Sequence, residues 1–464
     1  MTPLAELARA MFAAAVEAVR PPALMCRLAF LADGIAIDDS TMAPARQLVL
    51  VALGKAAPGL AAAFLARCRR HPDVLFALAP HGVPAPPEVD VFLRRGAHPI
   101  PDDAGERAAA ELLDLLAGLR PDDGVVLLLS GGSSALLALP LPGVTRQEVV
   151  GVTRALLDAG ASIHELNAVR KHLLAAAGGR LAATCPARLL TLVLSDVPGD
   201  DLATIASGPT VADPTTFADA HRVLQRRAVA SHFPGVVDFF ERGARGDIAE
   251  SPKPGETALA RSHVHLIGSS QEALAAAADT AAAAGFTPLI LTRAYRGEAR
   301  VFGETFGALA CQTDASVPRA VLAAGETTVT VHGAGRGGRN LEASLAAAAV
   351  LHGVPGRCVL IAGSDGVDGV SPAAGAVVDG DTLRRAAARG KDAAAALADN
   401  DSWGFFEGSD EAIVTGPTGT NVADLAFILV AGGRRIFMPA TKRGATLERG
   451  DAVTHYPRQT RKPT

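Results

Sequence analysis

The chain has 464 residues, 49% of them hydrophobic and 20% charged, which is enough apolar material for about two or three domains. Aromatic residues make up only 4% and the net charge is −4, which disfavours stacked-base recognition and broad polyanion binding, so we expect no nucleic-acid partner. The five cysteines form no CxxC pair and no run of about 18 apolar residues occurs, so we expect a cytoplasmic protein without a membrane partner.

In chain order, the sequence predicts an amphipathic helix that ends near Pro21, followed by alternating strands and helices. Short apolar runs predict buried strands at 48–53, 125–129, 189–194, 264–267, 288–291, 327–331 and 359–361. Helical patterns lie at 106–119, 272–284 and 340–351. Strands and helices that alternate in this way indicate an α/β fold.

A segment rich in Gly, Pro and charge at 243–257 interrupts this pattern and predicts a domain boundary. We therefore expect an N-terminal domain at 1–250 and a C-terminal domain at 258–440. The polar, basic residues 441–464 are expected to form a loosely held tail.

The strongest chemical signal is a turn between a strand and a helical run, formed by Ser130, Gly131, Gly132, Ser133 and Ser134. Glycines let the backbone approach a ligand, and the N–H groups that open a helix favour phosphate or carboxylate. Two other interpretations stay open, a plain turn with a serine cap and a serine-hydrolase elbow that lacks the last glycine of G-x-S-x-G.

Two charged side chains follow predicted strands directly. Lys55 stands in Gly-Lys-Ala-Ala, which is not a Walker A loop, and at the carboxyl edge of a sheet it could neutralise a phosphoryl group. Asp196 could hold Mg²⁺ or accept a proton. For Lys55 the alternative is a solvated surface lysine, and for Asp196 it is a turn of Asp, Pro and Gly without a ligand. For Asp200 and Asp201, which follow in the same segment, such a turn is the favoured interpretation.

A glycine-rich segment at 333–338 fits G-x-G-x-x-G. In a dinucleotide-binding fingerprint an acidic residue follows about 20 positions later, but the first acidic residue after the next predicted strand, Asp365, lies further along the chain than that. Arg336 and Arg339 suggest instead a loop that binds an anion through guanidinium groups. An exposed glycine loop without a ligand is the alternative. Asp365 and Asp368 lie in another glycine-rich turn, for which a polar turn is the default interpretation.

Together these segments resemble the type-2 glycerate kinase family that carries a MOFRL domain, whose older name is hydroxypyruvate reductase of the tartrate pathway. The similar segments span most of residues 45–430 in the order of the family. They read GKAA, SGGSSALL, VRKHL, GGRLA, LSDVPGDD, IASGPTVADPTT, GETTVTVHGAGRGGRN, AGSDGVDG and TGPTGTNVAD.

The resemblance implies a larger Rossmann-like parallel-sheet domain, a smaller C-terminal MOFRL α/β domain and a cleft between them. It also implies transfer of phosphate from ATP, with Mg²⁺, to the 2-hydroxyl of D-glycerate. Lys55 and Arg339 would be the catalytic pair, and Asp196 would orient the hydroxyl or bind the metal. Residues that bind the substrate or the nucleotide are expected at Ser130, Gly131, Gly132, Ser133, Ser134, Lys171, Gly335, Arg336, Gly337, Gly338, Asp365, Asp368, Asn400, Thr418 and Asn421.

We expect a monomer or homodimer whose partners are D-glycerate and ATP. Two alternatives stay open. The G-x-G-x-x-G match and the older family name allow an NAD(P)H-dependent hydroxypyruvate reductase, and a non-catalytic regulator that binds a sugar acid or a nucleotide is the second alternative.

Overall fold

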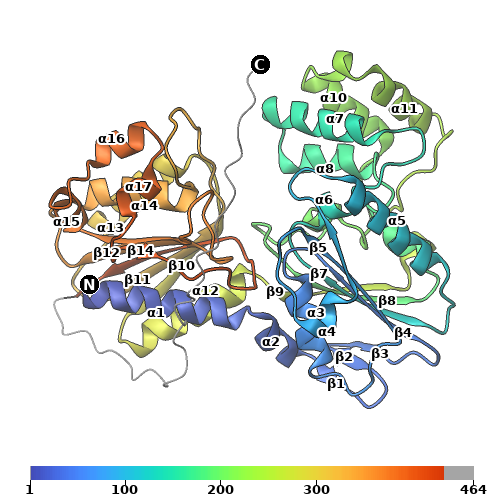
Figure 1. Cartoon of the computed structure of the whole chain (residues 1–464), viewed down its shortest axis with the longest axis horizontal. Helices are drawn as coiled ribbons and strands as arrows, with labels where there is room; N and C mark the ends of the chain where they lie inside the picture. The colour runs from blue at the N-terminus through green and yellow to red at the C-terminus, as the bar shows by residue number, and fades with distance from the viewer. Residues whose placement is uncertain (1, 433–464) are drawn as a thin grey trace.

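A computed structural model of the chain describes residues 2–432, which form two α/β lobes side by side (Figure 1). The predicted tail at 441–464 lies outside the described residues. Each lobe is built on a six-stranded sheet, and a separate three-stranded antiparallel sheet accompanies the first lobe. That small sheet consists of β1 (Ala29–Phe30), β2 (Ile35–Ile37) and β3 (Ser40–Met42).

The first lobe contains an entirely parallel sheet, as predicted. Its central strands are buried along nearly their whole length because apolar residues occupy both faces. In spatial order the strands are β6 (Leu93–Gly96), β5 (Val74–Pro80), β4 (Leu48–Leu53), β7 (Gly124–Leu129), β8 (Arg188–Leu194) and β9 (Ser262–Gly268). The helices around it are α2 (Pro21–Leu24), α3 (Ala57–Leu65), α4 (Pro87–Asp90), α5 (Asp103–Ala117), α6 (Ser133–Leu136) and α9 (Arg180–Thr184).

A cluster of helices caps this lobe and has a hydrophobic core of its own (Figure 1). Capping boxes begin three of its helices, at Thr145, Ser162 and Thr216. The cluster consists of α7 (Arg146–Asp158), α8 (Ile163–Lys171), α10 (Phe217–Arg226) and α11 (Pro234–Ala244). Short 3-10 helices lie at Met25–Arg27, Ile205–Ser207, Ala230–His232 and Thr257–Leu259.

The second lobe has a mixed sheet, in which only the first pair of strands is parallel. Short apolar runs do not reveal strand direction, so the sequence could not separate this sheet from a parallel one. Its spatial order is β10 (Thr287–Tyr295), β11 (Arg319–Gly325), β15 (Asp424–Val430), β12 (Arg357–Gly363), β13 (Gly375–Asp379) and β14 (Ala412–Ile413).

Helices cover both faces of the second sheet. The face nearer the first lobe's core carries α1 (Pro3–Ala18) and α12 (Ser270–Ala283), which pack on each other. The opposite face carries α13 (Ala299–Gln312), α14 (Arg339–Leu351), α15 (Thr382–Ala387), α16 (Ala393–Ala398) and α17 (Ser402–Phe406).

The predicted strand at 327–331 is wrong. The strand at this place is β11, and after Gly325 the chain is irregular apart from an isolated bridge between Thr328 and Glu298. Residues 320–324 are buried, whereas Thr328, Thr330 and Val331 are exposed. Strand β11 is rich in alanine, which has a low strand propensity, so the sequence did not indicate it. The β-branched residues at 327–331 have a high strand propensity and were therefore predicted as the strand.

The strand pairing also crosses the predicted division between 250 and 258. Strand β9 follows this segment but extends the first sheet beside β8. Helix α1 begins the chain but packs against α12 and the second sheet. The local sequence of β9 and α1 does not indicate which lobe each element joins. Tertiary packing decides it. The division at these residue numbers stays a prediction.

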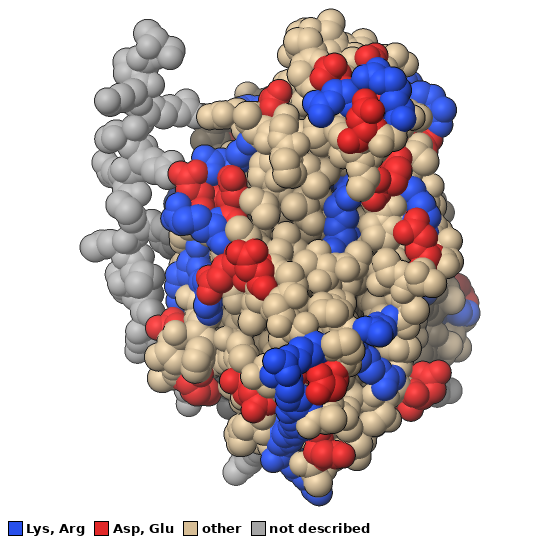
Figure 2. All heavy atoms as spheres, turned by 90° about the vertical axis from the view of Figure 1, so that its right-hand side faces the viewer, with Lys and Arg blue, Asp and Glu red and all other residues tan. Residues whose placement is uncertain are grey.

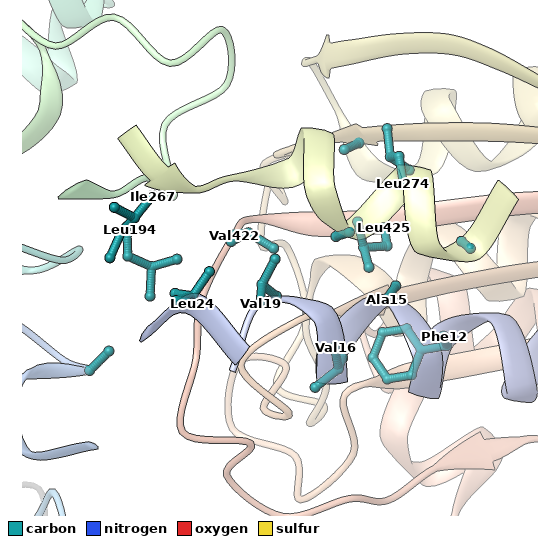
Figure 3. Packing of buried hydrophobic residues seen from close by; sticks show 14 of the residues in the cluster. Phe12, Ala15, Val16, Val19, Leu24, Leu194, Ile267, Leu274, Val422 and Leu425 are labelled. Carbon is teal, nitrogen blue, oxygen red and sulfur yellow. The ribbon is translucent and has the colours of Figure 1, made fainter. Parts of the chain in front are cut away.

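An apolar bridge joins the two lobes where the first helices pass between them (Figure 3). Leu24 lies beside Leu194 and Ile267 at the edge of the first sheet, and Val19 lies beside Val422 of the second lobe. These residues belong to one buried cluster. The continuous core therefore fixes the lobes against each other on the side where the chain crosses.

No helix within residues 2–432 has the length and apolar character needed to cross a membrane. On the outer face of the first lobe, acidic and basic residues are interspersed between large uncharged areas (Figure 2).

Candidate functional site

The first wall of the site is the turn that follows β7. Lys55 lies directly after β4, and its N–H donates to the Gly131 carbonyl at 2.8 Å. Gly54 has a φ of 104°, and a Cβ there would lie 2.4 Å from the Ser130 carbonyl oxygen, so only glycine permits this contact. The two strand ends are thereby locked together, which places the Lys55 side chain beside Gly132.

The serines of this turn have different roles. Ser130 Oγ donates to the Leu53 carbonyl and accepts from the Ala56 N–H, and Ser133 Oγ donates to the Ser130 carbonyl. Both are buried, so their hydroxyls hold the turn. Ser134 Oγ lies 3.2 Å from Ser207 Oγ. Within residues 2–432, no acceptor takes the N–H groups of Gly131, Gly132 and Ser133, which leaves three donors for an anion.

Two further side chains surround this turn. A Cβ on Gly131 would collide with the Asp196 carboxylate, and one on Gly132 would lie 3.2 Å from the His98 ring. Partial desolvation and the charge of Lys55 lower the pKa of His98 to about 4, so its imidazole is neutral at pH 7. Sequence reasoning missed His98 because it also missed β6, whose sequence LRRG has little apolar character.

The second wall is supplied by Arg339 at the first position of α14. Its Nε lies 2.6 Å from Asp424 Oδ2 and its Nη2 lies 3.0 Å from Asp424 Oδ1, a two-pronged ion pair. Its Nη1 lies 2.8 Å from Glu326 Oε1. Asp424 is 1% exposed, so this pair fixes the guanidinium in one orientation. Asp424 closes the segment TGPTGTNVAD, which was identified by sequence, but its own role was missed.

The two walls meet at Asp196. Asn421 of the second lobe donates from Nδ2 to Asp196 Oδ2 at 3.0 Å. Burial raises the pKa of Asp196, the charges of Lys55 and Arg339 oppose this increase, and the charge of Asp365 adds to it. Asn421 lies in the same segment as Asp424, the carboxylate that holds Arg339. Asp196 therefore lies between the turn that carries Lys55 and the segment that orients Arg339.

Asp365 is half-buried on the second wall, and burial raises its pKa while Lys55 and Arg339 oppose the increase. Thr418 supports it, because the Thr418 N–H donates to the Asp365 carbonyl at 3.0 Å. Thr418 Oγ1 donates to the Ser364 carbonyl at 2.6 Å, so this hydroxyl is used within the protein.

The glycine-rich segment is not a phosphate loop of the dinucleotide type. The N–H groups of residues 332–336 donate to residues 399–401, and Asn400 Oδ1 alone accepts two of them. A Cβ on Gly335 or Gly337 would collide with Asp401 or Ser402. The glycines therefore allow close packing between two loops. Arg336 is exposed and lies 3.4 Å from Glu407.

Lys171 is buried in the helical cap, where its Nζ lies 3.4 Å from Asp213 Oδ1. Asp213 also accepts from Thr215 and Ser251. The structure therefore gives Lys171 a partner within the first lobe, and its role in substrate binding stays a prediction.

Asp368 caps α14, because its carboxylate accepts the N–H groups of Asn340 and Leu341 at 3.1 and 2.8 Å. It is 2% exposed, and burial raises its pKa to about 7 although these two N–H groups oppose the increase. Asp368 thus supports the helix that carries Arg339.

We expect Asp368→Asn to make stability less dependent on pH. The pKa of Asp368 is higher in the folded chain than its ordinary 3.8, so the protonated group favours folding below pH 4 and this contribution is lost as the pH rises through 7. Relative to the variant, the wild type should lose up to about 4 kcal/mol of unfolding free energy over this interval. Urea unfolding of both proteins at about pH 4.5 and pH 8 measures the difference, and parallel pH dependences would contradict it.

The fold and these contacts define a class, a two-lobed α/β protein in which Asp196 of the first lobe, beside the turn that carries Lys55, contacts the segment of the second lobe that holds Arg339. Residues 7–240 match the family described as a domain of unknown function, DUF4147, and residues 319–424 match the MOFRL family.

Individual relatives cover most of the chain. A D-glycerate 2-kinase from Thermotoga maritima is 38% identical, over 83% of this chain and 91% of its own. An Agrobacterium vitis protein provisionally named hydroxypyruvate reductase is 41% identical, over 83% of this chain and 88% of its own. The crystal structure of a Thermotoga maritima glycerate kinase superposes with a TM-score of 0.78 and 36% identity, covering 92% of this chain and 99% of that one. The chain belongs to the glycerate kinase family with a MOFRL domain, which confirms the resemblance and the fold class predicted from sequence.

Proposed function

We propose that the protein is a glycerate 2-kinase, which transfers the γ-phosphoryl group of ATP to the 2-hydroxyl of D-glycerate. The observation that carries the proposal is the position of Asp196, which lies against the Gly131 turn beside Lys55 and accepts from Asn421 of the second lobe. Asn421 belongs to the same segment as Asp424, which holds Arg339. Phosphoryl transfer requires mainly positioning and neutralisation of charge, and two opposed cations supply both. The names of the kinase relatives support this substrate and this hydroxyl.

The two cations differ in how they are held. Arg339 is fixed by Asp424 and Glu326, so its guanidinium is oriented before a ligand binds. Within residues 2–432, no side chain forms an ion pair or hydrogen bond with Lys55 Nζ, so its charge is available to a phosphate or a carboxylate. The free N–H groups at Gly131, Gly132 and Ser133 add donors for the same anion.

In the proposed reaction Asp196 accepts the proton of the attacking hydroxyl. Its Oδ2 accepts from Asn421, which leaves Oδ1 for the substrate, and burial raises its pKa and so makes it a stronger base. The 2-oxygen of glycerate forms a bond to the γ-phosphorus while the bond from that phosphorus to the β,γ-bridging oxygen breaks. ADP leaves with that oxygen, and the hydroxyl proton passes to Asp196.

The carboxylates present fit a magnesium ion, although within residues 2–432 no three His, Cys, Asp or Glu side chains form a metal cluster. Mg²⁺ is usually held by one or two carboxylates together with substrate phosphates, and half-buried Asp365 offers such an oxygen donor. When bound, the ion would neutralise charge on the nucleotide phosphates. We propose Mg²⁺ and ATP as the cofactors on this basis.

The test is product identification with purified protein, D-glycerate, ATP and MgCl2. We expect ADP release and 2-phosphoglycerate as the product, which phosphorus NMR distinguishes from 3-phosphoglycerate. An absence of ADP release would contradict the proposal. Oxidation of NADH by hydroxypyruvate without ATP would instead support the reductase alternative.

A further inference from the structure

A pocket of about 610 Å³ lies on the second lobe, next to the start of α14. Its walls come from the chain after β11, from the glycine-rich segment and from the turn at 368–370. The residues that line it are Glu326, Thr327, Thr328, Val329, Val331, Gly335, Gly337, Gly338, Arg339, Glu342, Asp368, Gly369, Val370 and Asn400. Pockets of this size hold small organic ligands, and D-glycerate with its three carbons would fill only a small part of it.

The pocket has an apolar part formed by valines that the fold leaves uncovered. Val331 is 69% exposed and Val370 is 77% exposed, while Val329 is half-buried beside them. Exposed valines that gather at a cavity indicate contact with an apolar ligand surface, since each would otherwise be more stable when buried.

The pocket has a charged end and an apolar end. Arg339 also lines the pocket, and its partner Asp424 lies in the same segment as Asn421, which contacts Asp196 of the first lobe. Glu342 is paired with Arg300 and accepts from Asn400, and Asp368 caps α14. Their carboxylate oxygens are acceptors, which suit an amino group and not a phosphate. The charged end of a ligand therefore belongs at Arg339 and its uncharged end at the valines.

We infer that this pocket is the subsite for the purine ring of the nucleotide, so that the second lobe holds the base and the phosphates pass Arg339 toward Lys55. The inference rests on the proposed kinase function and extends it to the part of ATP that does not react. A flat apolar ring with an amino donor matches the valines and the carboxylates, and the phosphate chain matches Arg339.

The test is calorimetric binding, which does not depend on turnover. The probes are a non-hydrolysable ATP analogue and inorganic tripolyphosphate, which lacks the ring. The double variant Val331→Ser/Val370→Ser should weaken the analogue by about tenfold, because each substitution removes apolar contact, and should change tripolyphosphate binding by less than about twofold. Val91→Ser is the matched control, since Val91 is also 77% exposed and lies in the first lobe.

Unchanged affinity for the analogue, or an equal loss for tripolyphosphate, would overturn the inference. Turnover of D-glycerate with unchanged analogue affinity would reject this subsite and leave the kinase proposal standing. Analogue binding that the double variant weakens, without any turnover by the wild type, would reject the kinase proposal and retain the subsite.

Discussion

Replacing Lys55 with alanine is expected to lower kcat about a hundred- to a thousandfold while the fold is retained. Lys55 Nζ forms no ion pair or hydrogen bond with a side chain in residues 2–432, so its removal breaks no direct contact, and Asn421 still donates to the buried Asp196. In the proposed reaction the substitution removes a cation beside the transferring phosphoryl group, where preorganised charge contributes most to catalysis. The measurement is ADP release at saturating D-glycerate and ATP.

Lys391→Ala provides the matched control, because Lys391 is an exposed lysine of the second lobe outside the site. It should retain the wild-type kcat. A Lys55→Ala protein with a similar kcat would remove the lysine from the proposed mechanism.

Arg339→Ala is expected to reduce kcat by about a thousandfold or more and also to destabilise the protein. The substitution leaves Asp424, 1% exposed, without its two-pronged partner. Breaking a fully buried pair costs about 3–5 kcal/mol, and we expect about 2 kcal/mol here because the Arg339 side chain is 35% exposed and partly screened by solvent. Kinetic assays and urea unfolding measure the two effects separately.

A second variant separates catalysis from stability. Arg339→Ala/Asp424→Asn removes the unpaired carboxylate, so unfolding free energy should recover while turnover stays low. Arg336→Ala is the control from the same loop, since Arg336 is exposed and contacts Glu407 on the surface. Recovery of turnover in the double variant would show that Arg339 acts only by neutralising Asp424.

The sequence predicted many elements because their signals are local. Strands β4, β7 and β8 are continuous apolar runs, and each was expected within one residue of its observed bounds. The same holds for the charged residues at strand ends, since parallel strands must bring their carboxyl ends to one edge of the sheet. Lys55, the serine-glycine turn and Asp196 were therefore predictable as parts of one site from the sequence alone.

Other features depended on contacts between distant segments. A G-x-G-x-x-G pattern does not say whether its N–H groups face a ligand or another loop, and here residues 399–401 accept them. His98 follows a strand with little apolar character, so no pattern marked it. Lys171 belongs to a segment that resembles the family, but it pairs with Asp213, 42 positions further along the chain.

The sequence by itself determined the α/β class and the family, and it supplied the residues proposed for phosphoryl transfer, because periodicity and motifs are properties of short segments. Tertiary structure alone decided which sheet takes β9 and α1, which glycines pack against neighbouring loops, and which carboxylates orient Arg339. These choices depend on burial and on electrostatic interactions between residues far apart in the chain, and no local pattern encodes them.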